Sequence, residues 1–68
     1  MFKWYNFETN FRTLKDLLRG FLKALHIKYE LSDCSGADFG AWHFEIYTDS
    51  DGAKLINKWL DYHSYINE

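Results

Sequence analysis

The chain has 68 residues and a formal net charge of −2; hydrophobic residues make up 47% of it and aromatic residues 21%. Large apolar side chains are far denser here than in disordered sequences, and the length fits one small domain, residues 1–68. A single cysteine excludes an intramolecular disulfide framework, so a hydrophobic core and a reducing compartment are expected.

Membrane insertion and secretion are not indicated. A membrane-spanning helix needs about eighteen or more consecutive apolar residues, and the chain has no such run. The N-terminal sequence MFKWYNFETN lacks the apolar segment and small-residue cleavage site of a signal peptide. We therefore expect a cytoplasmic protein with no membrane partner.

The chain begins with a predicted strand and a predicted helix. Aromatic residues are dense in residues 2–8, which favours a strand. In residues 9–26, apolar residues recur at steps of three and four, the spacing of one helical face, and Thr9 or Asn10 is expected to be the N-cap. Gly20 lies inside this pattern, so either a neighbour packs closely there or the helix bends. The apolar residues are Phe11, Leu14, Leu17, Leu18, Phe21, Leu22 and Leu25.

Residues 27–49 predict a β-hairpin. Apolar residues alternate in both arms, and the segment CSGADFG between them is rich in turn-forming residues. The apolar sets share a face if Leu31 pairs with either Ile46 or Phe44. The first register would also place Cys34 opposite His43, and the sequence does not choose between the two.

Residues 49–68 predict a second helix that begins at the N-capping residues Asp49, Ser50 and Asp51. The element order is then β-α-β-β-α. Two helices packed on one face of a three-stranded sheet bury every apolar stripe, so we expect an α+β, two-layer sandwich. The residues expected to line the second helix's apolar side are Ala53, Ile56, Trp59, Leu60, His63 and Ile66.

No motif predicts catalysis, a cofactor or a metal. Cys34 beside His43 would lie on an open hairpin end among acidic residues, where a reactive thiolate is not favoured. The chain has one cysteine and three histidines, scattered over several elements, and lacks the close ligand spacing of a structural zinc site. His63 is expected to be a hydrogen-bonded histidine beside the core.

Two surfaces are candidates for binding. The outward sheet face is expected to combine aromatic and acidic residues, as protein interfaces do, with Phe39 at the hairpin tip as a further anchor. The residues predicted to bind a protein partner are Tyr5, Phe7, Glu30, Phe39, His43, Glu45 and Tyr47. The alternative surface is a basic stripe on the first helix, suited to a nucleic-acid backbone, made of Arg12, Lys15, Arg19 and Lys23.

The charges are segregated along the chain. Residues 1–28 carry six Lys or Arg against two acids, a balance of +4, and residues 29–68 carry eight acids against two Lys, a balance of −6. Such an asymmetry can orient a charged partner. In size and composition alone, the chain resembles the small inhibitors that bacteriophages and mobile elements encode, such as anti-CRISPR proteins and toxin-neutralising partners.

That resemblance implies a protein that binds and blocks. The sequence hypothesis is therefore a non-enzymatic, protein-binding inhibitor or regulator, whose acidic second half steers a partner. Nucleic-acid binding through the basic stripe is the alternative, and a homodimer is a third option because exposed strand edges can pair with a second copy.

Overall fold

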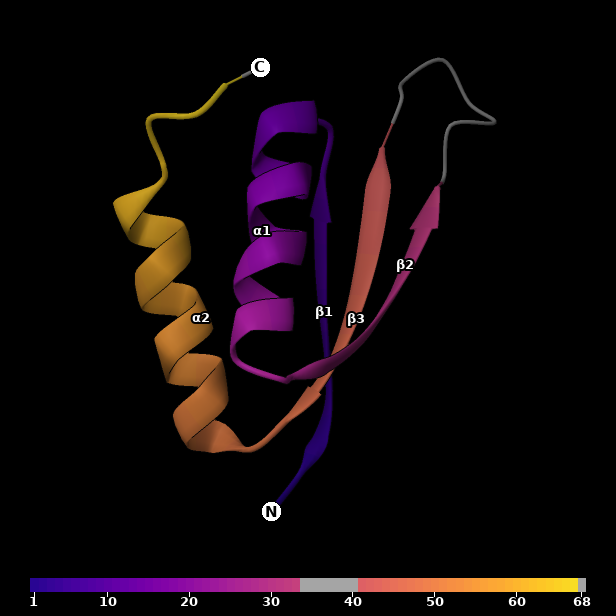
Figure 1. The fold of residues 1–68 in the computed structure, drawn as a ribbon, viewed down its shortest axis with the longest axis vertical. Coiled ribbons are helices and arrows are strands. Elements are labelled where there is room, and N and C mark those ends of the chain that lie inside the picture. The colour runs from indigo at the N-terminus through magenta and orange to yellow at the C-terminus, as the bar shows by residue number, and fades with distance from the viewer. Residues whose placement is uncertain (34–40, 68) are drawn as a thin grey trace.

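The computed structural model describes residues 1–33 and 41–67 and has the predicted α+β order, β-α-β-β-α (Figure 1). One three-stranded sheet and two helices make up the described part of the chain. The elements are β1 (Lys3–Thr9), α1 (Arg12–Ala24), β2 (Lys28–Asp33), β3 (Trp42–Thr48) and α2 (Ser50–Tyr62).

The sheet has the strand order β1-β3-β2, and both neighbours of β3 are antiparallel to it. β1 and β2 therefore run parallel to each other but are not adjacent, because β3 lies between them. α1 connects one edge strand to the other, and the last strand of the chain fills the centre of the sheet (Figure 1).

The register of the hairpin is the one that pairs Leu31 with Phe44. Tyr29 lies opposite Ile46, so the two apolar sets share a face, as the alternation predicts. His43 pairs with Ser32, and the alternative register, which would have placed Cys34 opposite His43, is not formed. Cys34 itself lies outside the described residues.

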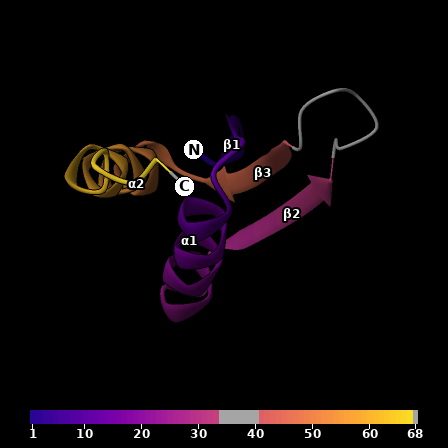
Figure 2. The same cartoon turned by 90° about the horizontal axis from the view of Figure 1, so that it is seen from above.

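The core lies against the Phe44 and Ile46 side of β3, and both helices contribute to it (Figure 2). α1 buries leucines at steps of four, the spacing that keeps side chains on one helical face. The helices also contact each other directly, since the rings of Phe21 and Trp59 stack with their centroids 5.0 Å apart. The buried cluster consists of Leu18, Leu22, Phe44, Ile46 and Ile56.

The first strand has the opposite orientation to the predicted one. Tyr5 lies opposite Ile46 and Phe7 lies opposite Phe44, so both belong to the core side of the sheet and both are half-buried. The predicted outward placement of Tyr5 and Phe7 is therefore wrong. Trp4 instead points outward, and Phe2 has the same position in the alternation. The sequence does not fix the orientation of this strand, because aromatic residues occupy both alternating sets of positions in FKWYNFE.

The ends of α1 depend on side-chain and backbone hydrogen bonds. The N-cap is Phe11 rather than Thr9 or Asn10, because β1 extends through Thr9, whose hydroxyl accepts the Phe11 N–H at 3.1 Å. At the C-terminus, Ile27 N–H donates to Leu22 O and His26 N–H to Lys23 O, a Schellman arrangement. His26 has φ 56°, a left-handed conformation that costs a non-glycine residue about 1 kcal/mol.

Helix α2 begins as predicted and ends earlier than predicted. Asp49 is the N-cap, and its carboxylate accepts the Gly52 N–H at 2.8 Å. The helix ends at Tyr62, and Ile66 is buried beyond it, after a turn that begins at His63. The predicted apolar side is therefore shared between the helix and the segment that follows it.

The two helical glycines are present in different surroundings. A Cβ at Gly20 would meet nothing within 4 Å, so close packing is not the reason for glycine there. Gly52 lies in the first turn of α2, and a Cβ there would overlap the side chain of the buried Thr48, the last residue of β3. Glycine is thus needed for space at Gly52 only.

We expect opposite effects from alanine at these two positions. Gly20→Ala should raise the free energy of unfolding by about 0.5–1 kcal/mol, because alanine restricts the unfolded chain and favours helix. Gly52→Ala should lower it by about 1–3 kcal/mol through overpacking against Thr48. Urea denaturation of both variants beside the unmodified chain tests this, and equal effects at the two sites would contradict it.

Candidate functional site

The face of the sheet opposite the core is not covered by a helix in the described part of the chain (Figure 2). The register arranges its side chains in three rows across β1, β3 and β2. All of these residues are exposed except the half-buried His43. We call this surface the open face; its rows are Trp4, Tyr47 and Lys28, then Asn6, Glu45 and Glu30, then Glu8, His43 and Ser32.

The first row forms an exposed aromatic cluster together with Phe2. The Tyr47 ring centroid lies 5.5 Å from that of Phe2 and 5.1 Å from that of Trp4. The ammonium of Lys28 lies 5.7 Å from the Trp4 ring centroid, within the range of a cation–π contact. Phe2 remains 57% exposed and Trp4 42%, so the cluster presents ring surface to solvent.

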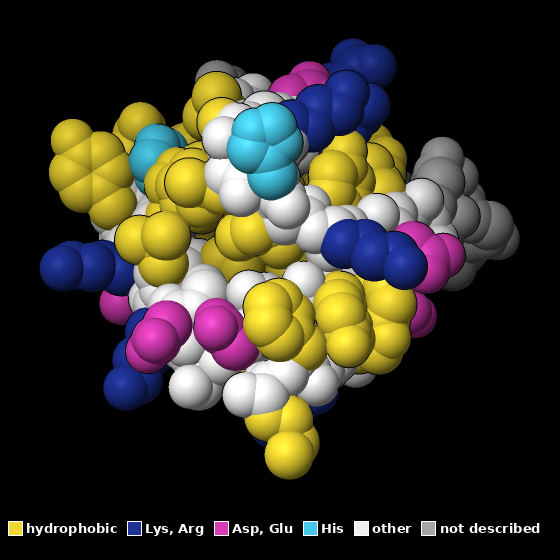
Figure 3. All heavy atoms as spheres, turned by 60° about the horizontal axis from the view of Figure 1, so that its bottom comes forward, with side chains coloured by type: hydrophobic (Ala, Val, Ile, Leu, Met, Phe, Trp, Pro, Cys, Tyr) yellow, Lys and Arg dark blue, Asp and Glu magenta, His cyan; other side chains and the backbone are white. Residues whose placement is uncertain are grey.

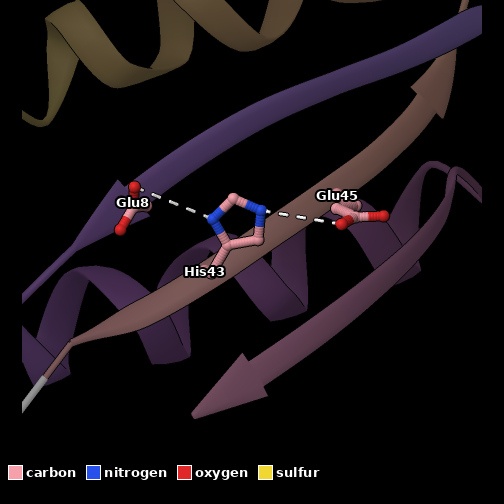
Figure 4. Close-up of polar contacts among 3 residues, drawn as sticks. All are labelled: Glu8, His43 and Glu45. Carbon is pink, nitrogen blue, oxygen red and sulfur yellow. Dashed lines mark ion pairs between the residues drawn. The ribbon is translucent and has the colours of Figure 1, made fainter. Parts of the chain in front are cut away.

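The other two rows carry the acidic groups. His43 lies between two carboxylates: its Nδ1 is 3.8 Å from Glu8 Oε1 and its Nε2 is 3.7 Å from Glu45 Oε1 (Figure 4). Both distances exceed those of a hydrogen bond, so the contacts are electrostatic when the imidazole is protonated. This half of the open face is consequently acidic, with one titratable base at its centre.

Glu30 and Glu45 lie directly opposite each other on β2 and β3. Two like charges at such a cross-strand pair destabilise a sheet. Sequence analysis placed both residues on the outward face, and the structure agrees. Their pairing gives the open face a local concentration of negative charge at a cost in stability.

The remaining predicted partner-binding residues are distributed differently. His43 and Tyr47 lie on the open face, and Tyr5 and Phe7 lie on the core side. Phe39 lies outside the described residues. The sequence analysis did not name Trp4 as a binding residue. The one indication of its role was that Trp4 and Phe2 are two positions apart and so lie on the same side of an extended segment.

The basic stripe on α1 is only partly available. Arg12, Arg19 and Lys23 are exposed. Lys15 is not: its Nζ lies 2.8 Å from Asp16 Oδ1 and 4.9 Å from the Trp42 ring centroid, and 14% of its side chain is exposed. The hydrogen bond from Lys15 and the charges of nearby arginines hold the pKa of Asp16 below its ordinary value.

His63 has the structural role that the sequence predicts. Its Nδ1 lies 2.9 Å from the carbonyl oxygen of Trp59, to which it donates, and its ring stacks on the Trp59 ring at 4.1 Å.

Among residues 1–33 and 41–67, no group of three or more His, Cys, Asp or Glu is placed to hold a metal ion.

Two hollows lie away from the centre of the open face. One has a volume of about 420 Å³ and lies between the end of α1, the start of α2 and the aromatic cluster. The other, of about 190 Å³, is lined in part by Leu17, Tyr65 and Ile66. Leu25 and Leu17 are exposed because they border these hollows rather than pack in the core, although the sequence pattern places them on the apolar face of the helix.

No helix in the described part of the chain is both long enough and apolar enough to cross a membrane. In the comparisons with known proteins, no family model matches the chain, and no curated protein or solved structure is significantly similar to it.

We expect Glu30→Lys to stabilise the fold, because it replaces a cross-strand repulsion by an attraction to Glu45. The gain should be about 1 kcal/mol at low salt, a rise in Tm of about 4–8 °C. At 1 M salt it should shrink, because screening then acts over about 3 Å. Glu30→Gln, the control, should give a smaller and less salt-dependent gain; equal gains at all salt concentrations would contradict the repulsion.

Proposed function

We propose that this chain is a small, non-enzymatic protein-binding module that inhibits or regulates its partner in the cytoplasm. The observation that carries the proposal is the open face, where an exposed aromatic cluster borders a group of carboxylates. The binding residues proposed are Phe2, Trp4, Tyr47, Glu8, Glu30, His43 and Glu45.

The aromatic cluster supports a role as a binding anchor. Interface hot spots are enriched in Trp and Tyr, and such rings bury a large area on binding with little loss of side-chain freedom. The Tyr47 ring already packs against both the Trp4 ring and the Phe2 ring, which reduces the entropy lost on association. Trp4 and Tyr47 lie on a sheet rather than on a loop, so their positions are well defined.

The carboxylates indicate the chemistry of the partner. Glu8, Glu30 and Glu45 face solvent in neighbouring rows, and Lys28 is the only Lys or Arg in the three rows. A partner surface that carries Lys or Arg beside an apolar patch would complement this arrangement and would be attracted to it over long range. The Glu30–Glu45 pair, which costs stability, is the kind of local conflict expected at a functional site.

Two observations favour binding over catalysis. His43 and its flanking carboxylates lie 3.7–3.8 Å apart on an uncovered sheet surface, farther than hydrogen-bond distance. In the described part of the chain, the hollows of about 420, 190 and 90 Å³ are all lined by residues other than His43, Glu8 and Glu45.

Nucleic-acid binding is the rival function. It would depend on Arg12, Arg19 and Lys23, since Lys15 is engaged by Asp16 and Trp42. Three exposed cations on one helix are a small electrostatic footprint beside an acidic sheet face. Self-association through the edge strands β1 and β2 is the third possibility.

Affinity capture with matched variants tests the proposal. Trp4→Ala and Tyr47→Ala should each weaken the captured partner's binding by about thirtyfold, the loss of about 2 kcal/mol that defines a hot spot. Glu45→Lys should slow association and reduce its salt dependence. Titration of each purified variant against the identified partner measures these effects.

The control is the double variant Tyr62→Ala/Tyr65→Ala, which removes two highly exposed rings from another surface and should bind normally. If this control loses the partner while Trp4→Ala keeps it, the open face is not the interface. If the captured material is nucleic acid, removed by nuclease and lost in an Arg12→Glu/Arg19→Glu/Lys23→Glu variant, the rival function is correct. Far-ultraviolet circular dichroism confirms that each variant is folded.

A further inference from the structure

The larger hollow has the size and lining of a small-molecule site. Its volume of about 420 Å³ falls within the range of about 300–1,000 Å³ that is typical of ligand pockets. Figure 3 views the end of the molecule that contains this hollow, where hydrophobic side chains gather around a recess and basic, His and acidic side chains lie around them. The lining residues with apolar side chains or rings are Phe2, Leu25, Ile27, Tyr47 and Leu55.

Basic side chains contribute to this lining. Lys28 and His26 line the hollow, and no Asp or Glu does. Asp49 lies next to one lining residue, Thr48, in the chain, and its carboxylate is engaged as the α2 N-cap, where it accepts the Gly52 N–H at 2.8 Å. A bound molecule would therefore meet an apolar surface with positive charge at its margin.

Two features of the hollow are not explained by the needs of the core. Leu25, the C-cap of α1, and Leu55, in α2, both line the recess, yet they remain 41% and 46% exposed. His26 lines the same recess in a left-handed conformation, at a helix C-terminus where glycine would be free of strain. Exposed leucines and a strained histidine gathered in one recess are features that a bound ligand would account for.

From this combination, we propose that the hollow binds an amphipathic carboxylate. The apolar tail lies against Phe2, Leu25 and Leu55, and the carboxylate lies at the Lys28 ammonium, with His26 as a second donor. The Lys28 ammonium lies 5.7 Å from the centroid of the Trp4 ring, which does not line the hollow, so the charge stands on the side of the hollow that borders the open face. The inference concerns a different ligand and mainly different residues from the protein-binding function, and does not depend on it.

Three probes with the same eight-carbon tail test the class of ligand: octanoate, 1-octanol and octylammonium, all kept below their aggregation limits. Methyl signals of Leu25, Ile27 and Leu55 are followed by carbon–proton NMR of the full chain at neutral pH. Octanoate should shift these signals in a saturable manner and bind about tenfold more tightly than octylammonium, because one ion is attracted and the other repelled. Octanol should have an intermediate affinity.

Two variants identify the contributions of charge and tail contact. Lys28→Met keeps an apolar stem, and should weaken octanoate binding about threefold to fivefold without changing octanol binding. Leu55→Glu introduces an anion into the recess and should abolish octanoate binding. Leu17→Glu is the matched control, since Leu17 is equally exposed but lines the other hollow, and it should bind octanoate normally.

The proposal is overturned if octanoate binds no more tightly than octylammonium, if Lys28→Met has no effect, or if the shifts centre on Leu17 and Ile66. Leu55 lies outside the open face, so Leu55→Glu should still capture the protein partner. Loss of octanoate binding with retained capture supports two separate sites. Failure of every probe overturns the ligand site alone and leaves the protein-binding proposal to its own test.

Discussion

Phe44 fixes the orientation of all three strands. It is fully buried in the central strand, with Phe7 opposite it on one side and Leu31 on the other, and α1 and α2 close over the same face through Leu18, Leu22 and Ile56. Because side chains alternate along a strand, this one set of pairs decides which residues of every strand face the helices and which face solvent. A slip of one residue in either pairing would expose the apolar set of the slipped edge strand and turn its outward residues toward the helices.

The surface chemistry follows from that arrangement. Trp4 and Tyr47 come together on the open face because Tyr5, Phe7, Phe44 and Ile46 are taken up by the core side. Glu30 and Glu45 come together because their neighbours Leu31 and Phe44 are paired. The sheet thus separates an apolar interior from an outer layer with an aromatic half and an acidic half, and this outer layer is the basis of the proposed protein-binding function.

The sequence predicts the element order, the hairpin and the shared parity of its arms, because each depends on local periodicity. It does not predict the register, since Leu31 opposite Ile46 and Leu31 opposite Phe44 satisfy the pattern equally. The orientation of β1 is also undetermined, because aromatic residues occupy both parities; two of the three predicted aromatic anchors of the described sheet, Tyr5 and Phe7, are misplaced for this reason. The engagement of Lys15 by Trp42 depends on tertiary contact, which helical spacing cannot reveal.

Side-chain proton contacts measured by nuclear Overhauser spectroscopy test the orientation of the strands most directly. We expect contacts between the Phe7 and Phe44 rings, between Trp4 and Tyr47, and none between the Trp4 indole and the methyl groups of Leu18 or Leu22. Contacts from the Trp4 indole to those leucines, with Tyr5 and Phe7 free in solvent, would contradict the register and with it the open face.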